Sequence, residues 1–186
     1  MLTSLNSDVR QLLLRTAREA ILAQFDGEEL PPPELPYTPE ASGVFVTVHV
    51  SGNLRGCIGF LELGDGLLDT IAEAARRAAA NDPRFYAVRE DEMDDCHLEI
   101  TLLGPIERID DADDFEIGQH GLTLDCQGRR GLLLPQVPIE RGWDKAAFLT
   151  GLCQKTRVPD RSWEEPAAIL SRFAGVVIRE DDAHES

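Results

Sequence analysis

The 186-residue sequence has no long apolar run, no excess of positive charge and no cysteine spacing typical of a metal site. Residues 1–20 carry charges throughout, whereas a membrane helix needs about 20 apolar residues in a row and a signal peptide needs an apolar core. We therefore expect neither, and we expect a cytoplasmic protein. The cysteines at 57, 96, 126 and 153 form no C-x-x-C pair, so we expect reduced thiols and no structural zinc.

Negative charge dominates the composition. The chain has 18 Lys and Arg residues against 34 Asp and Glu residues, which gives a net charge of −16. Such a field repels phosphate backbones and anionic lipid, so we expect binding to neither nucleic acid nor membrane. Apolar residues make up 42% and charged residues 28%, as in ordinary globular proteins, and the length suits one domain or two subdomains that share a core.

Helix signals mark three segments of the chain. Ser4 or Asn6 can cap the first helix, and Pro83 ends the second, which is rich in alanine. Asp144 can cap the third. We therefore predict helices up to about residue 25, over 67–81 and up to about residue 155.

Strand patterns and turn residues fill much of the rest. Residues 28–39 contain five prolines, which favour an extended strap. Helices and hairpins mix without a regular βαβ order, so we predict an α+β fold. Two hairpins are predicted, one with strands over 43–50 and 54–60 and one with strands over 122–127 and 131–134. Two further strands are predicted over 97–103 and over 168–179, the second with a bend at Ala174 and Gly175.

The apolar faces predict the register of the first hairpin. The even-numbered valines of residues 44–50 and the apolar even positions of 54–60 point to one side of their strands. A three-residue loop over 51–53 pairs even with even positions, whereas a two-residue loop exposes half of the valines, so we predict the longer loop. Two polar pairs then share the other face: Thr47 opposite Cys57, and His49 opposite Arg55.

This polar face has residue types that support thiol chemistry. Arg55 lies two residues from Cys57 on one strand, and its positive charge favours the thiolate, which is the nucleophilic form. Cys57 is therefore a candidate catalytic nucleophile, with His49 as its candidate base. A simpler interpretation stays open, in which Cys57 is packed and Arg55 pairs with a carboxylate such as Glu99.

A metal site is the less favoured interpretation of the same region. His49, His97 and Glu99 are suitable ligand types, but they meet only if the strand over 97–103 lies beside the hairpin. We predict no metal site. We also predict that His120 lies in a turn and that the acidic run over 110–114 is a solvated loop.

The segment LRGCIG over 54–59 resembles the hallmark hexapeptide of the AMMECR domain family, whose prokaryotic members are called AmmeMemoRadiSam system protein A. The segment DPRF over 82–85 resembles the part of that family that follows a helix, and LLLPQV over 132–137 resembles its second signature. The similarity covers about residues 12–180. It departs from the family at KTRVP over 155–159, where the family has Lys-Ala-Gly.

This resemblance implies a single α+β domain over 1–186, with a core over about 12–180 and a polar tail over 181–186. It further implies two intimate subdomains and a mixed, barrel-like sheet with flanking helices. It implies partnership with a Memo-like protein and a radical SAM protein, but neither a defined reaction nor a cofactor.

The candidate site residues come from matching positions and from the hairpin face. Arg55 and Arg84 would bind an anionic group, while Asp82 can equally close a turn and Gln136 can equally satisfy backbone groups. The leading interpretation is a component of a modification system that acts through residues 54–59. The alternatives are a stand-alone thiol-dependent enzyme acting on a small anionic substrate, and a structural scaffold. The candidates are Cys57 as catalytic residue and Arg55, Thr47, His49, Asp82, Arg84 and Gln136 as ligand-binding residues.

Overall fold

A computed structural model describes residues 5–28 and 31–180. It divides the chain into two units: unit 1 contains the chain up to residue 103 and from residue 176 onwards, and unit 2 contains residues 104–175. The predicted polar tail over 181–186 and the possible cap Ser4 lie outside the described residues. Within the described part, no helix is long and apolar enough to cross a membrane.

The helices of unit 1 begin and end close to where the sequence predicts. Helix α1 (Ser7–Asp26) is capped by Asn6, whose Oδ1 accepts a hydrogen bond from the backbone N–H of Val9 at 2.9 Å. Helix α2 (Leu67–Ala80) ends before the predicted Pro83 signal. A short 3-10 helix, η2 (Glu90–Asp95), leads into the next strand. The predicted positions of α1 and α2 are confirmed, whereas η2 was not predicted.

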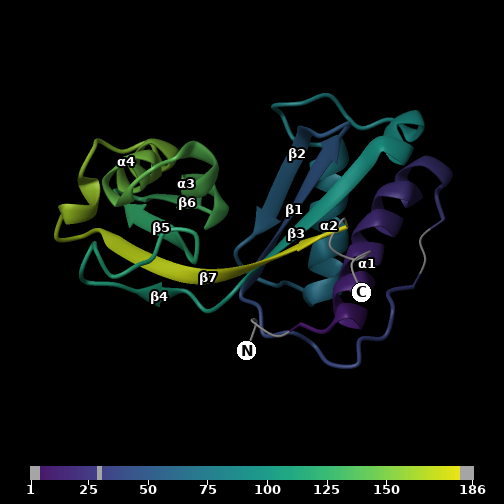
Figure 1. Ribbon diagram of the computed structural model, residues 1–186, viewed down its shortest axis with the longest axis horizontal. Coiled ribbons are helices and arrows are strands. Elements are labelled where there is room, and N and C mark those ends of the chain that lie inside the picture. The colour runs from purple at the N-terminus through teal and green to yellow at the C-terminus, as the bar shows by residue number, and fades with distance from the viewer. Residues whose placement is uncertain (1–4, 29–30, 181–186) are drawn as a thin grey trace. The chain divides into compact units, whose positions relative to one another are not determined.

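The sheet of unit 1 has the strand order β2-β1-β3-β7, and β1 is antiparallel to both β2 and β3. Helices α1 and α2 pack against one face of this sheet, which the valines of β1 and the apolar residues of β3 line (Figure 1). Val44, Val46 and Val48 are fully buried there, as predicted. The strands are β1 (Gly43–Val50), β2 (Asn53–Phe60), β3 (Cys96–Leu103) and the C-terminal part of β7 (Ile169–Arg179).

The predicted three-residue loop of the first hairpin is wrong. Its turn has two residues, Ser51 and Gly52, and the first pair beyond it is Val50 with Asn53. Both turn residues have positive φ, 49° and 77°, as a type I′ hairpin turn requires.

A β-bulge then restores the pairing of even with even positions. His49 lies opposite Leu54, not opposite Arg55 as predicted, and the register shifts before Val48 pairs with Gly56. Arg55 is the extra residue of the bulge. The valine face is therefore preserved by an inserted residue in β2 and not by the length of the loop.

Unit 2 combines short strands with two helices. Helix α4 is capped by Asp144, as predicted, and packs on β5 and β6 around a core that includes Phe148 and Leu152. Strand β5 is antiparallel to β6 and to the N-terminal part of β7. His120 is the first residue of β5, so the prediction that it lies in a turn is wrong. The elements are β4 (Glu107–Arg108), β5 (His120–Cys126), β6 (Arg129–Leu133), α3 (Gln136–Arg141), α4 (Lys145–Thr156) and η3 (Ser162–Glu164).

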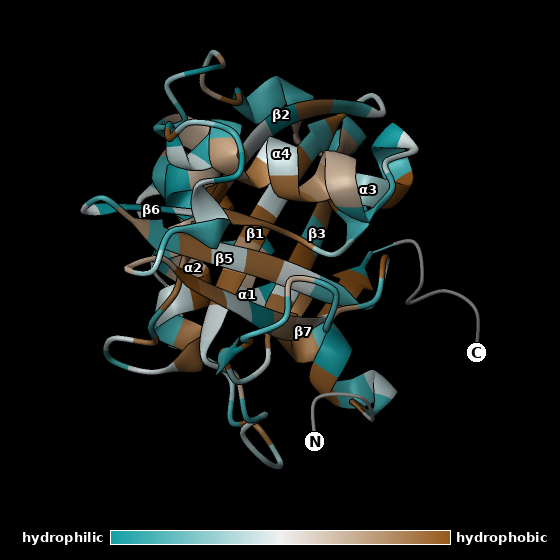
Figure 2. Cartoon of the chain, turned by 90° about the vertical axis from the view of Figure 1, so that its left-hand side faces the viewer, coloured by the Kyte–Doolittle hydropathy of each residue, from teal (hydrophilic) through white to brown (hydrophobic). Residues whose placement is uncertain are grey.

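Strand β7 contributes to both units, and the boundary between them falls after Gly175, next to the predicted bend. In Figure 2 the strands carry much of the hydrophobic colour, whereas the connecting loops are mostly hydrophilic. The predicted α+β fold class is confirmed by the order of helices and antiparallel strands.

Candidate functional site

Cys57 lies in the middle of β2, the edge strand of the unit 1 sheet. Its backbone N–H donates to Oδ2 of Asp82 at 2.9 Å, and its carbonyl accepts from Nη2 of Arg84 at 3.2 Å. Both groups thus point away from β1, which makes Cys57 and Thr47 a non-hydrogen-bonded pair, the kind in which opposed side chains approach most closely. Thr47 Oγ1 donates to Cys57 Sγ at 3.3 Å.

Asp82 holds the segment after α2 against this strand. Its side chain is buried and also accepts from the backbone N, Nε and Nη2 of Arg84 at 3.1, 2.9 and 2.6 Å. These bonds, above all those from the Arg84 side chain, hold the pKa of Asp82 well below its usual range. The side chain of Arg84 is 54% exposed, so it can still meet an anionic group.

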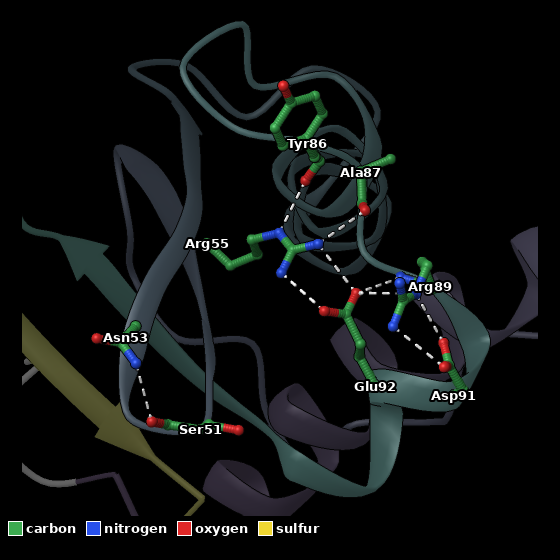
Figure 3. Close-up of polar contacts among 8 residues, drawn as sticks. All are labelled: Ser51, Asn53, Arg55, Tyr86, Ala87, Arg89, Asp91 and Glu92. Atoms are coloured by element: carbon green, nitrogen blue, oxygen red, sulfur yellow. Dashed lines mark hydrogen bonds and ion pairs between the residues drawn. The ribbon is translucent and has the colours of Figure 1, made fainter.

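Arg55 is committed to a separate set of contacts. Its two terminal nitrogens bind the carboxylate of Glu92, each at 2.9 Å, in a bidentate pair (Figure 3). Its Nε donates to the carbonyl of Tyr86 at 2.9 Å and its Nη2 to that of Ala87 at 3.0 Å. The suggested pairing of Arg55 with Glu99 is therefore wrong. Arg55 instead fixes the backbone between α2 and η2.

The thiol of Cys57 is half-buried, and burial raises its pKa above the ordinary value. The hydrogen bond from Thr47 and the charge of Arg84 lower the pKa, but they do not outweigh the cost of removing a thiolate from water. The prediction that Arg55 favours the thiolate is wrong, because Glu92 neutralises that guanidinium. Cys57 is mainly a thiol at neutral pH.

The structure thus brings together four of the predicted site residues: Thr47, Cys57, Asp82 and Arg84. His49 lies instead opposite His97 in the ladder between β1 and β3. Gln136 is half-buried at the start of α3 in unit 2. Within residues 5–28 and 31–180, no three His, Cys, Asp or Glu side chains form a group that could hold a metal ion.

Two residues of this region, Glu92 and Tyr86, were missed from the sequence. Glu92 was not predicted as the partner of Arg55, although it belongs to an acidic run just before a predicted strand. Tyr86 is 91% exposed, and no periodic pattern marks it as a surface feature. Leu54 is 42% exposed, so its predicted place on the valine side is wrong, because the bulge at Arg55 sets Leu54 opposite His49. Leu54 and Tyr86 give the region two large exposed apolar side chains.

The comparisons identify proteins that resemble this chain along almost its whole length. The AMMECR1 family model matches residues 14–178. A protein from Methanothermobacter thermautotrophicus is 38% identical over 186 residues, covering 95% of this chain and 97% of that protein. Protein MK0488 from Methanopyrus kandleri is 37% identical, covering 92% and 88%. The crystal structure of uncharacterized protein PH0010 from Pyrococcus horikoshii has a TM-score of 0.85 and 34% identity, covering 93% and 92%. The resemblance inferred from the hexapeptide is confirmed.

Proposed function

This chain belongs to the AMMECR1 family, and we propose that it is a cytosolic component of a multi-protein modification system. In this proposal it acts by binding other proteins through a surface around the hexapeptide. This surface consists of Leu54 and Arg55 from the hexapeptide and of Arg84 and Tyr86 from the segment after α2. The expected partners are a Memo-like protein and a radical SAM protein, because the resemblance of the hexapeptide implies both.

The observation that carries the proposal is the pair of exposed apolar side chains beside Arg55. Leu54 precedes Arg55 in β2, and Tyr86 is held through its carbonyl by the guanidinium of Arg55. Tyrosine is enriched in the buried centres of protein interfaces, where single aromatic side chains carry much of the binding energy. A backbone that is already fixed loses little entropy when a partner binds. These features support a preformed recognition surface.

Replacing Tyr86 with alanine should weaken binding to the partner by roughly tenfold or more, because it removes the largest exposed apolar group of the surface. The measurement is isothermal titration calorimetry with the purified Memo-like and radical SAM proteins from the same genome. The matched control is Ile139→Ala in α3, since Ile139 is also a large exposed apolar residue, at 61%, but lies in unit 2. Equal effects of the two substitutions, or no binding of either protein to the unmodified chain, would contradict the proposal.

The alternative is a stand-alone thiol-dependent enzyme that uses Cys57 on a small anionic substrate. The observation that favours it is Arg84, whose exposed guanidinium lies at the Cys57 carbonyl and lowers the pKa of the thiol. Against it stands the net rise in that pKa, because only the thiolate is a strong nucleophile. The two functions therefore differ in how fast the thiol reacts at neutral pH.

A further inference from the structure

A pocket of about 230 Å³ opens on the face of the unit 1 sheet that is turned away from the valines. The side chains that give it chemical character are His49 from β1, His97 and Glu99 from β3, and Arg179 from β7. The proposed function uses none of these four residues.

The strand register places the two imidazoles side by side. His49 is paired directly with His97 in the antiparallel ladder between β1 and β3, so the third strand does lie beside the hairpin. Opposed residues of such a ladder point to the same face, with Cβ atoms roughly 4.5–5.5 Å apart. The neighbouring pair, Val48 and Leu98, is buried in the core on the other side. Both imidazoles therefore line the pocket.

Glu99 stands two residues beyond His97 on the same face of β3, but its carboxylate binds Arg179 at 2.8 Å. This ion pair neutralises the guanidinium, which would otherwise repel a cation in the pocket.

We propose that His49 and His97 together bind one divalent transition-metal ion of the class that prefers imidazole, such as Ni²⁺ or Zn²⁺. Neutral imidazole is a good ligand for both ions, and water completes the coordination. The two imidazoles lie on adjacent strands and can chelate one ion. Once the first imidazole has bound the ion, the second is already close to it, so its binding is an intramolecular step with a high effective concentration. The half-buried His49 and the exposed His97 leave the pocket accessible to a hydrated ion.

The first test is proton NMR of the imidazole Cε1–H signals while Ni²⁺, which is paramagnetic, is added to the unmodified chain. The signals of His49 and His97 should broaden together at the lowest metal concentrations. His120 is the internal control, since it lies in unit 2 and its Nδ1 accepts the backbone N–H of Glu116 at 3.0 Å. Broadening of only one of the two signals, or of His120 first, would overturn the proposal.

The second test is calorimetric titration of Ni²⁺ into a chain carrying His120→Ala and His184→Ala, where only the proposed pair of histidines remains. We expect one ion per chain, and binding weakened by about tenfold or more when either His49 or His97 is also replaced by alanine. Cys57→Ser in the same background should leave the affinity unchanged, which excludes the thiol as the ligand. Unchanged affinity for Ni²⁺ after replacement of His49 or His97 would overturn the proposal. If one of these variants does not fold, the NMR titration of the unmodified chain tests the proposal in its place.

Discussion

Replacing Gly56 with alanine is expected to destabilise the chain by about 3 kcal/mol, at the upper end of the usual cost of overpacking. A Cβ atom at Gly56 would lie 1.9 Å from the carbonyl oxygen of Ala78 and 2.8 Å from its carbonyl carbon. These are backbone atoms of α2, which cannot move aside as a flexible side chain can. Strand β2 would have to separate from α2, and the contact between Cys57 and Asp82 would be strained with it.

Urea denaturation of the two proteins measures this loss as a lower midpoint and a smaller free energy of unfolding. Gly64→Ala is the matched control, because no heavy atom lies within 4 Å of a Cβ built there. We expect the control to differ from the unmodified chain by less than about 0.5 kcal/mol. If Gly56→Ala were as harmless as this control, β2 would not pack against α2 as closely as described.

Replacing Asp82 with asparagine is expected to cost about 2–3 kcal/mol at pH 7. The buried carboxylate accepts hydrogen bonds from the backbone N–H of Cys57 and from three nitrogens of Arg84. The amide of asparagine has no negative charge, and its NH₂ group is a donor that cannot accept a hydrogen bond from these N–H groups. Breaking a fully buried ion pair costs more, roughly 3–5 kcal/mol. The smaller figure applies here because water screens the exposed guanidinium of Arg84.

The same variant should reveal a pH dependence of known sign. The pKa of Asp82 in the folded chain lies below its value in the unfolded chain, about 3.9, so the charged carboxylate stabilises the fold at all pH values above that. This contribution is lost as the pH falls toward the folded pKa. The difference in unfolding free energy between the unmodified chain and Asp82→Asn should therefore be constant from pH 7 to 5 and shrink below about pH 4.

Urea denaturation at pH 7, 5 and 3 measures this difference. Asp91→Asn is the control, because Asp91 and its partner Arg89 are both largely exposed and such pairs contribute little. A gap that widened on acidification, or equal effects of the two substitutions, would show that Asp82 does not hold β2 to the segment after α2.

Much of the fold follows from local sequence signals. Asn6 and Asp144 cap α1 and α4 as their side chains predict, and the alternating valines of β1 identify the core face. The hairpin loop was not predictable, because a three-residue loop and a two-residue turn with a bulge give the same pairing beyond Gly56. Ser51 adds no signal, since serine rarely adopts the positive φ that this turn requires.

The candidate site was predictable only in part. Thr47 and Cys57 follow from the register, and Asp82 and Arg84 follow from the family resemblance. The partner of Arg55 was not predictable, because Glu92 lies 37 residues away in the short 3-10 helix η2, at the end of a segment whose path depends on tertiary packing. The exposure of Tyr86 depends on the same path.

The contacts of the hexapeptide support the proposed role in recognition. The guanidinium of Arg55 is bound to Glu92 and to two carbonyls, and the backbone of Cys57 is bound to Asp82 and Arg84. These polar groups fix β2 and the segment after α2 together. What remains for other molecules is an exposed Leu54, an exposed Tyr86 and the outer side of Arg84.

The rate at which iodoacetamide alkylates Cys57 is the most direct test of whether this thiol is a packed neighbour or a nucleophile. It is measured from pH 6 to 10 by mass spectrometry of the peptide that contains Cys57, with the urea-unfolded chain as the reference. Because burial raises the pKa of Cys57, we predict that the folded chain reacts more slowly than the reference at pH 7, and that its rate rises only at higher pH than in the reference. A folded chain that reacted faster than the unfolded chain at pH 7 would contradict a role in recognition alone and favour the thiol-dependent enzyme.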